Sequence, residues 1–257
     1  MKEYILLTGA SSGIGYEMVN QLAAKKMNLI LVARTESKLQ QMQADLTNKY
    51  GIAVEYYAAD LSDVNAAMSI YKAVKQEKFI VTHLVNNAGV GNYGHFTDTS
   101  LEEELSMIQL NISSLVVLTK LFAQDMVSRK SGRIMNVGSV VSFLPMPYLS
   151  VYSATKAFVK AFSETLDAEL EGTGVTVISL YPGTVNTDFT TAEMASTNLH
   201  KTKAMHPKEV AIQGVEHLLE GNGKKVVGFQ NWFNTKLPNF VPDGIMMKIK
   251  KGLASQR

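Results

Sequence analysis

The chain carries a glycine-rich turn close to its N-terminus, with the sequence Thr8-Gly9-Ala10-Ser11-Ser12-Gly13-Ile14-Gly15. A short apolar run, Tyr4 to Leu7, precedes the turn, and apolar residues at helical spacing follow it through Leu22. Glycines let the backbone bend sharply and approach a pyrophosphate, whose charge is stabilised by free amides at a helix N-terminus. A purely structural turn is the alternative, but the position between a strand and a helix favours a dinucleotide site.

Alternating strand and helix patterns continue along the rest of the chain. Further strands are expected at residues 29–32, 54–59, 83–85, 133–137, 175–180 and 225–228. Helices are expected at residues 35–50, 62–77, 101–122, 150–170 and 207–220. This alternation predicts an α/β fold of the Rossmann type, with a doubly wound parallel sheet of about seven strands, helices on both faces and a single domain over residues 1–257.

Composition narrows the class of protein. The chain has 257 residues, 46% of them hydrophobic, a formal net charge of +2 and no cysteine. Interspersed charges do not predict a nucleic-acid groove, and without cysteine there are no disulfides or thiolate nucleophiles. No secretory signal and no apolar run of ~18 uncharged residues is recognised, so we expect a cytoplasmic protein without membrane contact.

The end of the second expected strand indicates which dinucleotide binds. Ala33, Arg34 and Thr35 stand where an NAD site usually presents a carboxylate to the ribose 2′-hydroxyl. A 2′-phosphate requires a cation instead, so Arg34, with Lys38 beside it, favours NADP(H), although NAD(H) stays possible. The alternative is that Arg34 is a solvated loop residue, and Glu36 weakens the prediction.

A tyrosine and a lysine lie four residues apart, at Tyr152 and Lys156, within the helix expected at residues 150–170. This separation places both side chains on one helical face, where an ammonium would lower the pKa of the phenol and make it a usable acid or base. A surface pair without function is the alternative. Asn111 is also ambiguous, because its amide beside an apolar helical face could be solvated, bound to backbone, or part of a site.

Taken together in their order, these motifs resemble those of the short-chain dehydrogenase/reductase family over residues 3 to about 228. The matching set is Thr8-Gly9-x-x-x-Gly13-Ile14-Gly15, Asn86-Asn87-Ala88-Gly89, Asn111, Ser139, Tyr152-x-x-x-Lys156 and Pro182-Gly183. Each motif is weak singly, and their joint order and spacing carry the resemblance.

The resemblance implies a role for each matching residue in NADPH-dependent reduction of a ketone or aldehyde. Tyr152 would be the general acid or base, Ser139 would hydrogen-bond the carbonyl oxygen, Lys156 would lower the tyrosine pKa and hold the ribose, and Asn111 would anchor a water. The expected cofactor contacts are Gly9, Ser11, Ser12, Gly13, Ile14, Gly15, Arg34, Lys38, Asp60, Leu61, Asn87, Ala88, Gly89, Tyr152, Lys156, Pro182, Gly183, Val185 and Thr187. No metal is expected, because phenol and serine polarise the carbonyl.

The remaining segments suggest the substrate and its cover. We expect the substrate between residues 143–149, residues 93–96 and a covering loop at 188–206, all mostly apolar or aromatic, which favours an uncharged, largely apolar ketone or aldehyde. The C-terminal extension, residues 229–257, mixes apolar residues with lysines. Packing over the pocket or a subunit interface is favoured there over lipid contact, and a homodimer or homotetramer is expected.

Two other functions fit the same motifs. An alcohol dehydrogenase working in the oxidative direction would use the same side chains, because hydride transfer is reversible. A cofactor-sensing protein that keeps the fold without turnover is less favoured, because a sensor has no need of the acid.

Cofactor preference is directly testable. Family members that prefer NADP often carry a basic residue immediately before the second motif glycine, where this chain has Ser12, so the preference depends mainly on Arg34. The double variant Ala33→Asp with Arg34→Ile should shift preference toward NADH, because a carboxylate pairs with the 2′-hydroxyl and repels a 2′-phosphate. Steady-state kinetics with both cofactors measures the shift, and unchanged NADPH/NADH selectivity would contradict the assignment.

Overall fold

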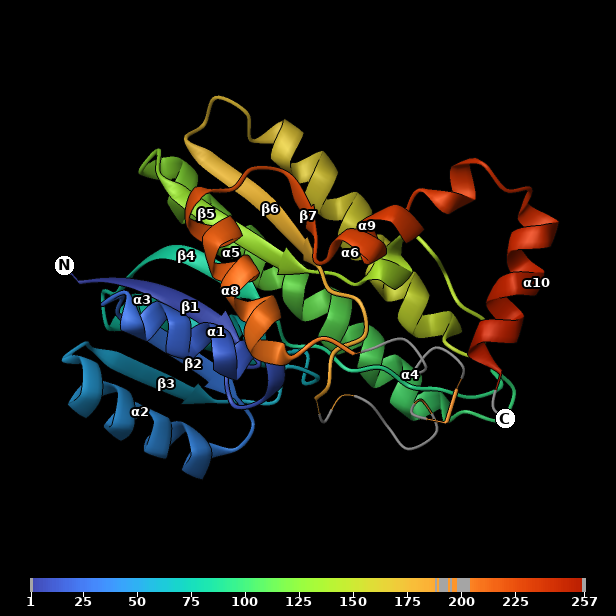
Figure 1. The fold of residues 1–257 in the computed structure, drawn as a ribbon. Coiled ribbons are helices and arrows are strands. Elements are labelled where there is room, and N and C mark those ends of the chain that lie inside the picture. Colours follow the sequence, from blue (N-terminus) through green and yellow to red (C-terminus); the bar gives the residue numbers. More distant parts are fainter. Residues whose placement is uncertain (1, 188, 190–193, 195, 198–203, 256–257) are drawn as a thin grey trace.

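A computed structural model describes residues 2–187, 189, 194, 196–197 and 204–255. Seven parallel strands form one sheet in the order β3-β2-β1-β4-β5-β6-β7, with helices on both faces (Figure 1). The strands are β1 (Glu3–Thr8), β2 (Leu29–Ala33), β3 (Val54–Ala58), β4 (Ile80–Asn86), β5 (Gly132–Val137), β6 (Val175–Tyr181) and β7 (Lys224–Val226). The Rossmann-type, single-domain prediction is confirmed.

The helices are α1 (Gly13–Ala24), α2 (Glu36–Tyr50), α3 (Ala66–Gln76), α4 (Leu101–Ile108), the π-helix η1 (Gln109–Ser114), α5 (Leu115–Ser128), the 3₁₀ turn η2 (Val140–Ser142), α6 (Ser150–Glu169), α8 (Pro207–Glu220), α9 (Phe229–Asn234), the 3₁₀ turn η4 (Leu237–Asn239) and α10 (Asp243–Ala254). Most expected bounds agree within a few residues. Helix α3 begins four residues later than expected, because Asp60 and Asp63 accept backbone hydrogen bonds from Ser62 and Asn65 and form turns there.

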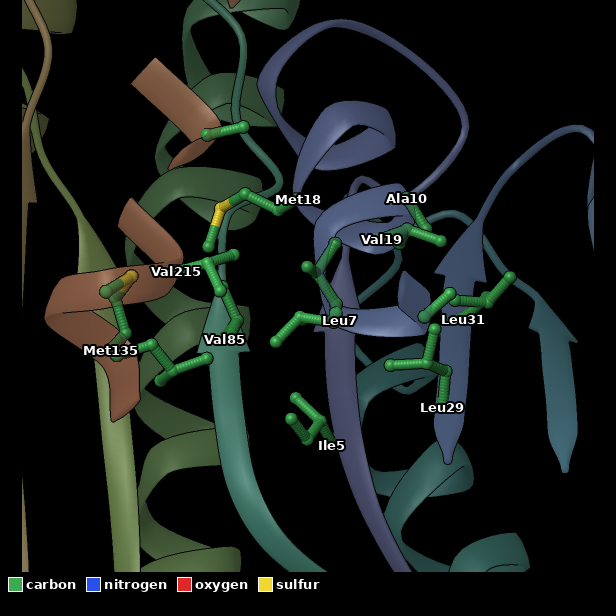
Figure 2. Close-up of a cluster of buried hydrophobic side chains, with 14 of the residues drawn as sticks. Ile5, Leu7, Ala10, Met18, Val19, Leu29, Leu31, Val85, Met135 and Val215 are labelled. Atoms are coloured by element: carbon green, nitrogen blue, oxygen red, sulfur yellow. The ribbon is translucent and has the colours of Figure 1, made fainter. Parts of the chain in front are cut away.

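Side chains of alternate strand residues enter two separate apolar layers. On one face, Ile5 and Leu7 of β1 pack with Met18 and Val19 of α1 and with Val215 of α8 (Figure 2). The opposite layer contains the alternating β1 residues Tyr4 and Leu6 together with side chains of α3 and α5. Burial on both faces explains why the strands are near-continuous apolar runs rather than alternating polar and apolar residues.

The helical run Leu101–Ser128 is long and apolar enough, by length and composition alone, to cross a membrane. In this fold, Leu118, Phe122 and Met126 of α5 are buried against the sheet. The second half of the run, α5, is therefore a core helix, whereas Leu101 and Leu105 of α4 are exposed. The π-helical middle of the run, η1, was not foreseen, and such insertions often occur at functional sites.

A buried polar network joins β4, β5, α5 and α6 inside this core. The Asn86 side-chain amide donates to Thr119 Oγ1 and to Asn136 Oδ1, both at 2.9 Å. Asn136, which is fully buried, donates in turn to Ser163 Oγ at 3.0 Å. Because buried amides are costly when unpaired, the network fixes how α6 lies against the sheet.

Removing the centre of the network should destabilise the fold. Asn136→Ala leaves Asn86 and Ser163 each without one partner and opens a small cavity, so we expect a loss of about 2 to 3 kcal/mol in the free energy of unfolding. Urea unfolding followed by circular dichroism measures it. The matched control, Asn48→Ala on the exposed side of α2, should change stability much less. Equal effects of the two substitutions would contradict the role of the network.

Candidate active site

The sequence-predicted residues converge on one cavity of about 510 Å³ at the carboxyl ends of the strands, where open parallel sheets bind ligands. Its lining includes Gly9, Ser12, Gly13, Ile14, Arg34, Asn87, Ala88, Gly89, Ser139, Tyr152, Lys156, Pro182, Gly183, Val185 and Thr187. Six predicted residues lie outside this lining, namely Ser11, Gly15, Lys38, Asp60, Leu61 and Asn111. Most of the predicted site residues thus lie together at one place in the fold.

The glycine turn fits a diphosphate at the N-terminus of α1. Gly9 and Gly13 have positive φ angles of 68° and 54°, which favour glycine. A Cβ on Gly15 would lie 2.1 Å from the Gly9 carbonyl oxygen, so only glycine allows the helix to begin this close to the strand. The first turn of α1 has neither a side-chain cap nor an acidic residue. Its amides and helix dipole therefore remain available to an anionic ligand.

Asn87 holds the turn after β4 against this glycine turn. Its side-chain amide donates to the carbonyls of Thr8 at 3.0 Å and Gly9 at 3.3 Å, while its backbone amide donates to Thr8 Oγ1. The Asn-Asn-Ala-Gly motif thus has a structural task beside any contact with the cofactor. Asn87 thereby holds together the turn after β1 and the turn after β4, which both border the cavity.

Arg34 lies at the end of β2 and lines the cavity with its side chain exposed. Lys38 is exposed in the first turns of α2 and does not reach the lining. The Asp60 carboxylate accepts from the backbone amide and hydroxyl of Ser62, and these bonds, helped by Arg34, lower the pKa of Asp60. Arg34 is therefore the cation that this edge of the cavity offers to a 2′-phosphate.

Tyr152 is buried, and its phenol is paired with Ser139. Burial raises the pKa of Tyr152 to about 12, and the hydrogen bond with Ser139 lowers it by less. This is opposite to the direction predicted from the Tyr-x-x-x-Lys spacing. Desolvation opposes the phenolate more strongly than its neighbours favour it, so the tyrosine holds its proton throughout the neutral range.

Lys156 lies on the same buried face of α6, with Nζ 6.0 Å from the centroid of the Tyr152 ring. Its Nζ donates to the Val137 carbonyl oxygen at 2.9 Å. Burial lowers the pKa of Lys156 to about 8. The lysine therefore remains mostly an ammonium at neutral pH, and its hydrogen bond to Val137 holds it at the end of β5.

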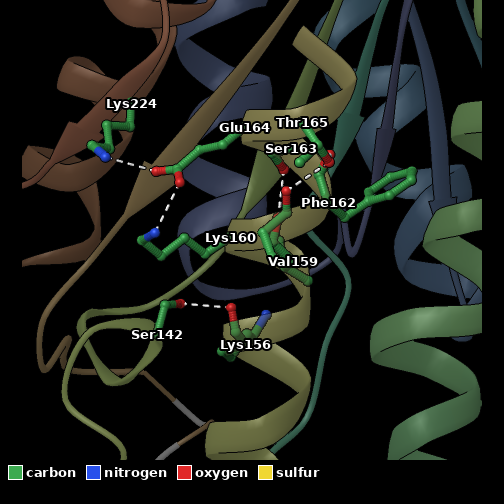
Figure 3. Close-up of polar contacts among 10 residues, drawn as sticks. Ser142, Lys156, Val159, Lys160, Phe162, Ser163, Glu164, Thr165 and Lys224 are labelled. Atoms are coloured by element: carbon green, nitrogen blue, oxygen red, sulfur yellow. Dashed lines mark hydrogen bonds and ion pairs between the residues drawn. The ribbon is translucent and has the colours of Figure 1, made fainter. Parts of the chain in front are cut away.

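Helix α6 is anchored at several points along its length (Figure 3). Ser142 Oγ donates to the Lys156 carbonyl oxygen at 2.8 Å, which ties the turn after Ser139 to the helix. Farther along, Glu164 accepts from Lys160 and from Lys224 of β7. These contacts keep Tyr152, Lys156 and Ser139 in fixed relation, as a pre-organised catalytic group requires.

Asn111 lies in the π-helical turn η1, where its side chain is occupied by protein groups. Its amide nitrogen donates to the Val90 carbonyl oxygen at 2.9 Å and to Thr155 Oγ1 at 3.1 Å, and its Oδ1 accepts from the Val90 amide at 3.0 Å. Both amide hydrogens are therefore used. The Asn111 side chain therefore holds the loop after β4 against α6. The sequence predicted only that Asn111 anchors a water and did not predict this positioning role.

Apolar side chains form the wall opposite the cofactor residues. Tyr93, Leu149, Phe189 and Met194 line the cavity, and the Phe189 ring lies 5.5 Å from that of Tyr152. Thr197 also lines the cavity. Three described residues of the expected cover at 188–206 thus belong to the wall, while residues 188, 190–193, 195 and 198–203 lie outside the described part.

The expectation for residues 143–149 and 93–96 was only partly right. Phe143 packs edge-on against Tyr181 with ring centroids 4.8 Å apart, and Phe96 is exposed, so neither lines the cavity. Sequence reasoning also missed Gly91, where a Cβ would lie 2.7 Å from Phe189 Cζ and 3.3 Å from Tyr152 Cδ2. The only sequence signal for it was a second glycine shortly after the Asn-Asn-Ala-Gly motif.

Burial of the Lys156 ammonium should be visible in the pH dependence of stability. Its folded-state pKa of about 8 lies below the usual 10.5, so the unfolded chain binds more protons between these values and stability rises there with pH. Relative to Lys156→Met, the wild-type free energy of unfolding should rise by about 2 kcal/mol from about pH 7 to about pH 9.5.

Urea unfolding at both pH values measures this change. The variant Lys38→Met, which removes an exposed positive charge, is the control. Parallel pH profiles for wild type and Lys156→Met would show that the buried ammonium does not titrate as the structure indicates.

Comparison with known proteins agrees with this geometry. A family model described as short chain dehydrogenase matches residues 3–198. The chain is 37% identical over 234 residues to a very-long-chain 3-oxoacyl-CoA reductase of Pyrenophora tritici-repentis, covering 88% of this chain and 66% of that protein. It is 32% identical over 268 residues to a protein of the same name from Phaeosphaeria nodorum, covering 97% of this chain and 76% of the other. The chain thus spans about two thirds to three quarters of these relatives' length.

Two solved structures extend the comparison. A short-chain dehydrogenase from Sphingobium yanoikuyae in complex with NADPH is 27% identical and superposes with a TM-score of 0.81 over 95% of this chain and 97% of the other. A 7β-hydroxysteroid dehydrogenase, 24% identical, superposes with a TM-score of 0.85 over 96% of each chain and shares the fold. This chain belongs to the short-chain dehydrogenase/reductase family and is an oxidoreductase that acts on carbonyl and alcohol groups.

Proposed function

We propose that this enzyme reduces a largely apolar ketone or aldehyde to the alcohol with NADPH, and that Tyr152 is the general acid. The single observation that carries the proposal is the buried Tyr152 phenol, paired with Ser139 in the same cavity as the glycine turn and Arg34. The NADPH bound to the Sphingobium yanoikuyae relative supports the choice of cofactor.

Each side chain has a distinct task in the proposed reaction. NADPH supplies a hydride to the carbonyl carbon when it is bound. Tyr152 donates its phenolic proton to the carbonyl oxygen, and Ser139 hydrogen-bonds the same oxygen, so negative charge does not accumulate there. A pKa of about 12 keeps the phenol protonated before the reaction, which suits an acid. The Lys156 ammonium favours the phenolate that remains until a proton returns.

Two observations support an apolar substrate. Tyr93, Leu149, Phe189 and Met194 form the wall, and such side chains bind hydrocarbon better than charge. The curated relatives are named for 3-oxoacyl-CoA reduction, which places a ketone on a very long acyl chain. We therefore include 3-oxoacyl thioesters among the carbonyl compounds to be tested.

Assembly and location are further proposals. Phe158 and Phe162 of α6 stack with ring centroids 5.7 Å apart, and Leu105 and Ile108 of the neighbouring α4 are exposed. This apolar surface supports a homodimer or homotetramer. We propose a cytoplasmic enzyme.

The central test separates an enzyme from a cofactor sensor. Tyr152→Phe removes the proton donor while keeping the ring that packs on Phe189, so it should retain NADPH binding and lose at least about a thousandfold in turnover. Fluorescence titration with NADPH and consumption of NADPH with a panel of ketones, aldehydes and 3-oxoacyl thioesters measure the two properties. NADH and the corresponding alcohols, assayed in parallel, reveal an oxidative enzyme.

Two outcomes would contradict the proposal. Wild-type protein that binds NADPH but turns over nothing in the panel would favour the sensor. Undiminished turnover by Tyr152→Phe would remove Tyr152 from the role of acid. The matched control Tyr50→Phe, at the end of α2 and outside the cavity lining, keeps the proton donor and should remain active.

A further inference from the structure

The C-terminal extension presents large apolar side chains to the surroundings. Phe229 and Phe240 are 80% and 83% exposed, and Trp232 and Phe233 are about half exposed. Together with α10, these residues form an arm that extends beyond the β-sheet (Figure 1). The sequence predicted that this segment packs over the pocket or at a subunit interface. Within the described part of the chain, however, these four aromatic side chains are not buried.

Helix α10 has two distinct apolar faces. Met246 and Ala254 are buried, and they share one side of the helix with Lys250. A second stripe with a four-residue period consists of Ile245, Ile249 and Leu253, which are 42% to 55% exposed. The helix is thus fixed to the domain by one face and leaves the adjoining apolar face uncovered.

Exposed lysines border the uncovered apolar residues. On α10, Lys248 lies one turn from Ile245 and borders the stripe, whereas Lys251 lies on the opposite side of the helix, one turn from Met247. In the preceding segment, Lys236 lies 5.8 Å from the centroid of the Trp232 ring. Residues 229–257 contain five Lys or Arg residues and a single acidic residue, although the whole chain has a net charge of only +2. Positive charge is therefore concentrated beside the exposed apolar surface.

The buried end of α10 adjoins the substrate wall. Tyr93 Oη donates to the Ala254 carbonyl oxygen at 2.6 Å, and Ala254 packs in the same apolar cluster as Tyr152, Leu149 and Met194. A surface that covers the exposed stripe of α10 would thus lie close to the part of the cavity that receives the substrate.

We propose that the arm from α9 to α10 docks on an anionic lipid surface. Aromatic and aliphatic side chains would enter the boundary between headgroups and acyl chains, and Lys236 and Lys248 would pair with anionic headgroups. The arm lies on the surface and does not cross it, because α10 has only twelve residues.

A second copy of the chain fits this surface less well. A symmetric dimer places the same patch against itself, so it would bring together two segments that each carry five Lys or Arg residues and a single acidic residue. An anionic bilayer provides the opposite charge over the whole patch. Charge complementarity therefore selects lipid as the occupant.

Trp232 is the only tryptophan in the chain and reports directly on the arm. Full-length protein is titrated with vesicles of phosphatidylcholine alone and with vesicles containing about one third phosphatidylglycerol. We expect a blue shift of Trp232 emission and co-sedimentation with the anionic vesicles, at least about tenfold tighter than with the neutral ones and weakened by salt.

Matched variants separate the contribution of the apolar stripe from that of the lysines. Ile249→Ser with Leu253→Ser should abolish the blue shift, whereas Val64→Ser with Ile212→Ser, at exposed apolar positions outside the arm, should not. Lys236→Glu with Lys248→Glu should weaken binding to anionic vesicles by about tenfold or more. Turnover of a water-soluble ketone by every variant reports on folding, and it separates failure of lipid docking from failure of the proposed activity.

Three outcomes would overturn the proposal. The protein could fail to bind either vesicle, or it could bind both equally. Alternatively, the Trp232 shift could follow protein concentration in the absence of vesicles, with sedimentation velocity showing a dimer that the Ile249→Ser/Leu253→Ser variant dissociates. The last result would assign the arm to a second copy.

Discussion

The close contact between the glycine turn and the end of β4 is the constraint on which the site depends. A side chain at Gly15 would collide with the Gly9 carbonyl, and the Asn87 amide binds the carbonyls of Thr8 and Gly9. The start of α1 is thereby fixed at the carboxyl edge of the sheet, between β1 and β4, where the strand order reverses. The cavity opens there, and its anion-binding character follows from helix amides that no side chain caps.

A second constraint is the removal of Tyr152 and Lys156 from water. Burial acts on both groups by opposing their charged forms, so it raises the pKa of Tyr152 and lowers the pKa of Lys156. As a result, the Tyr152 phenol keeps its proton at neutral pH, and the Lys156 ammonium has a pKa of about 8, close to neutral pH. Such a site costs folding stability, and the anchored helix α6 and the Asn86–Asn136–Ser163 network oppose this cost with buried hydrogen bonds.

The apolar wall of the cavity is assembled from segments far apart in the chain. Tyr93 follows β4, Leu149 precedes α6, Phe189 and Met194 follow β6, and Ala254 ends α10. The hydrogen bond from Tyr93 to Ala254 joins this wall to the C-terminal arm. The wall that would select an apolar substrate and the arm that would bind an anionic lipid surface are therefore neighbouring parts of the structure.

The sequence alone determined the parallel fold and the bounds of most elements, and it predicted most of the residues that line the cavity, because strand and helix periodicities and glycine requirements are local properties. It could not give the direction of the Tyr152 pKa shift, since helical spacing brings Lys156 near but says nothing about how far both groups are buried. Three other features were decided only by the tertiary structure. Asn111 forms hydrogen bonds with Val90 and Thr155, and Phe143 packs against Tyr181. The side chains of Ile249 and Leu253 remain exposed. Those outcomes depend on which distant segments meet, and a local pattern does not contain that information.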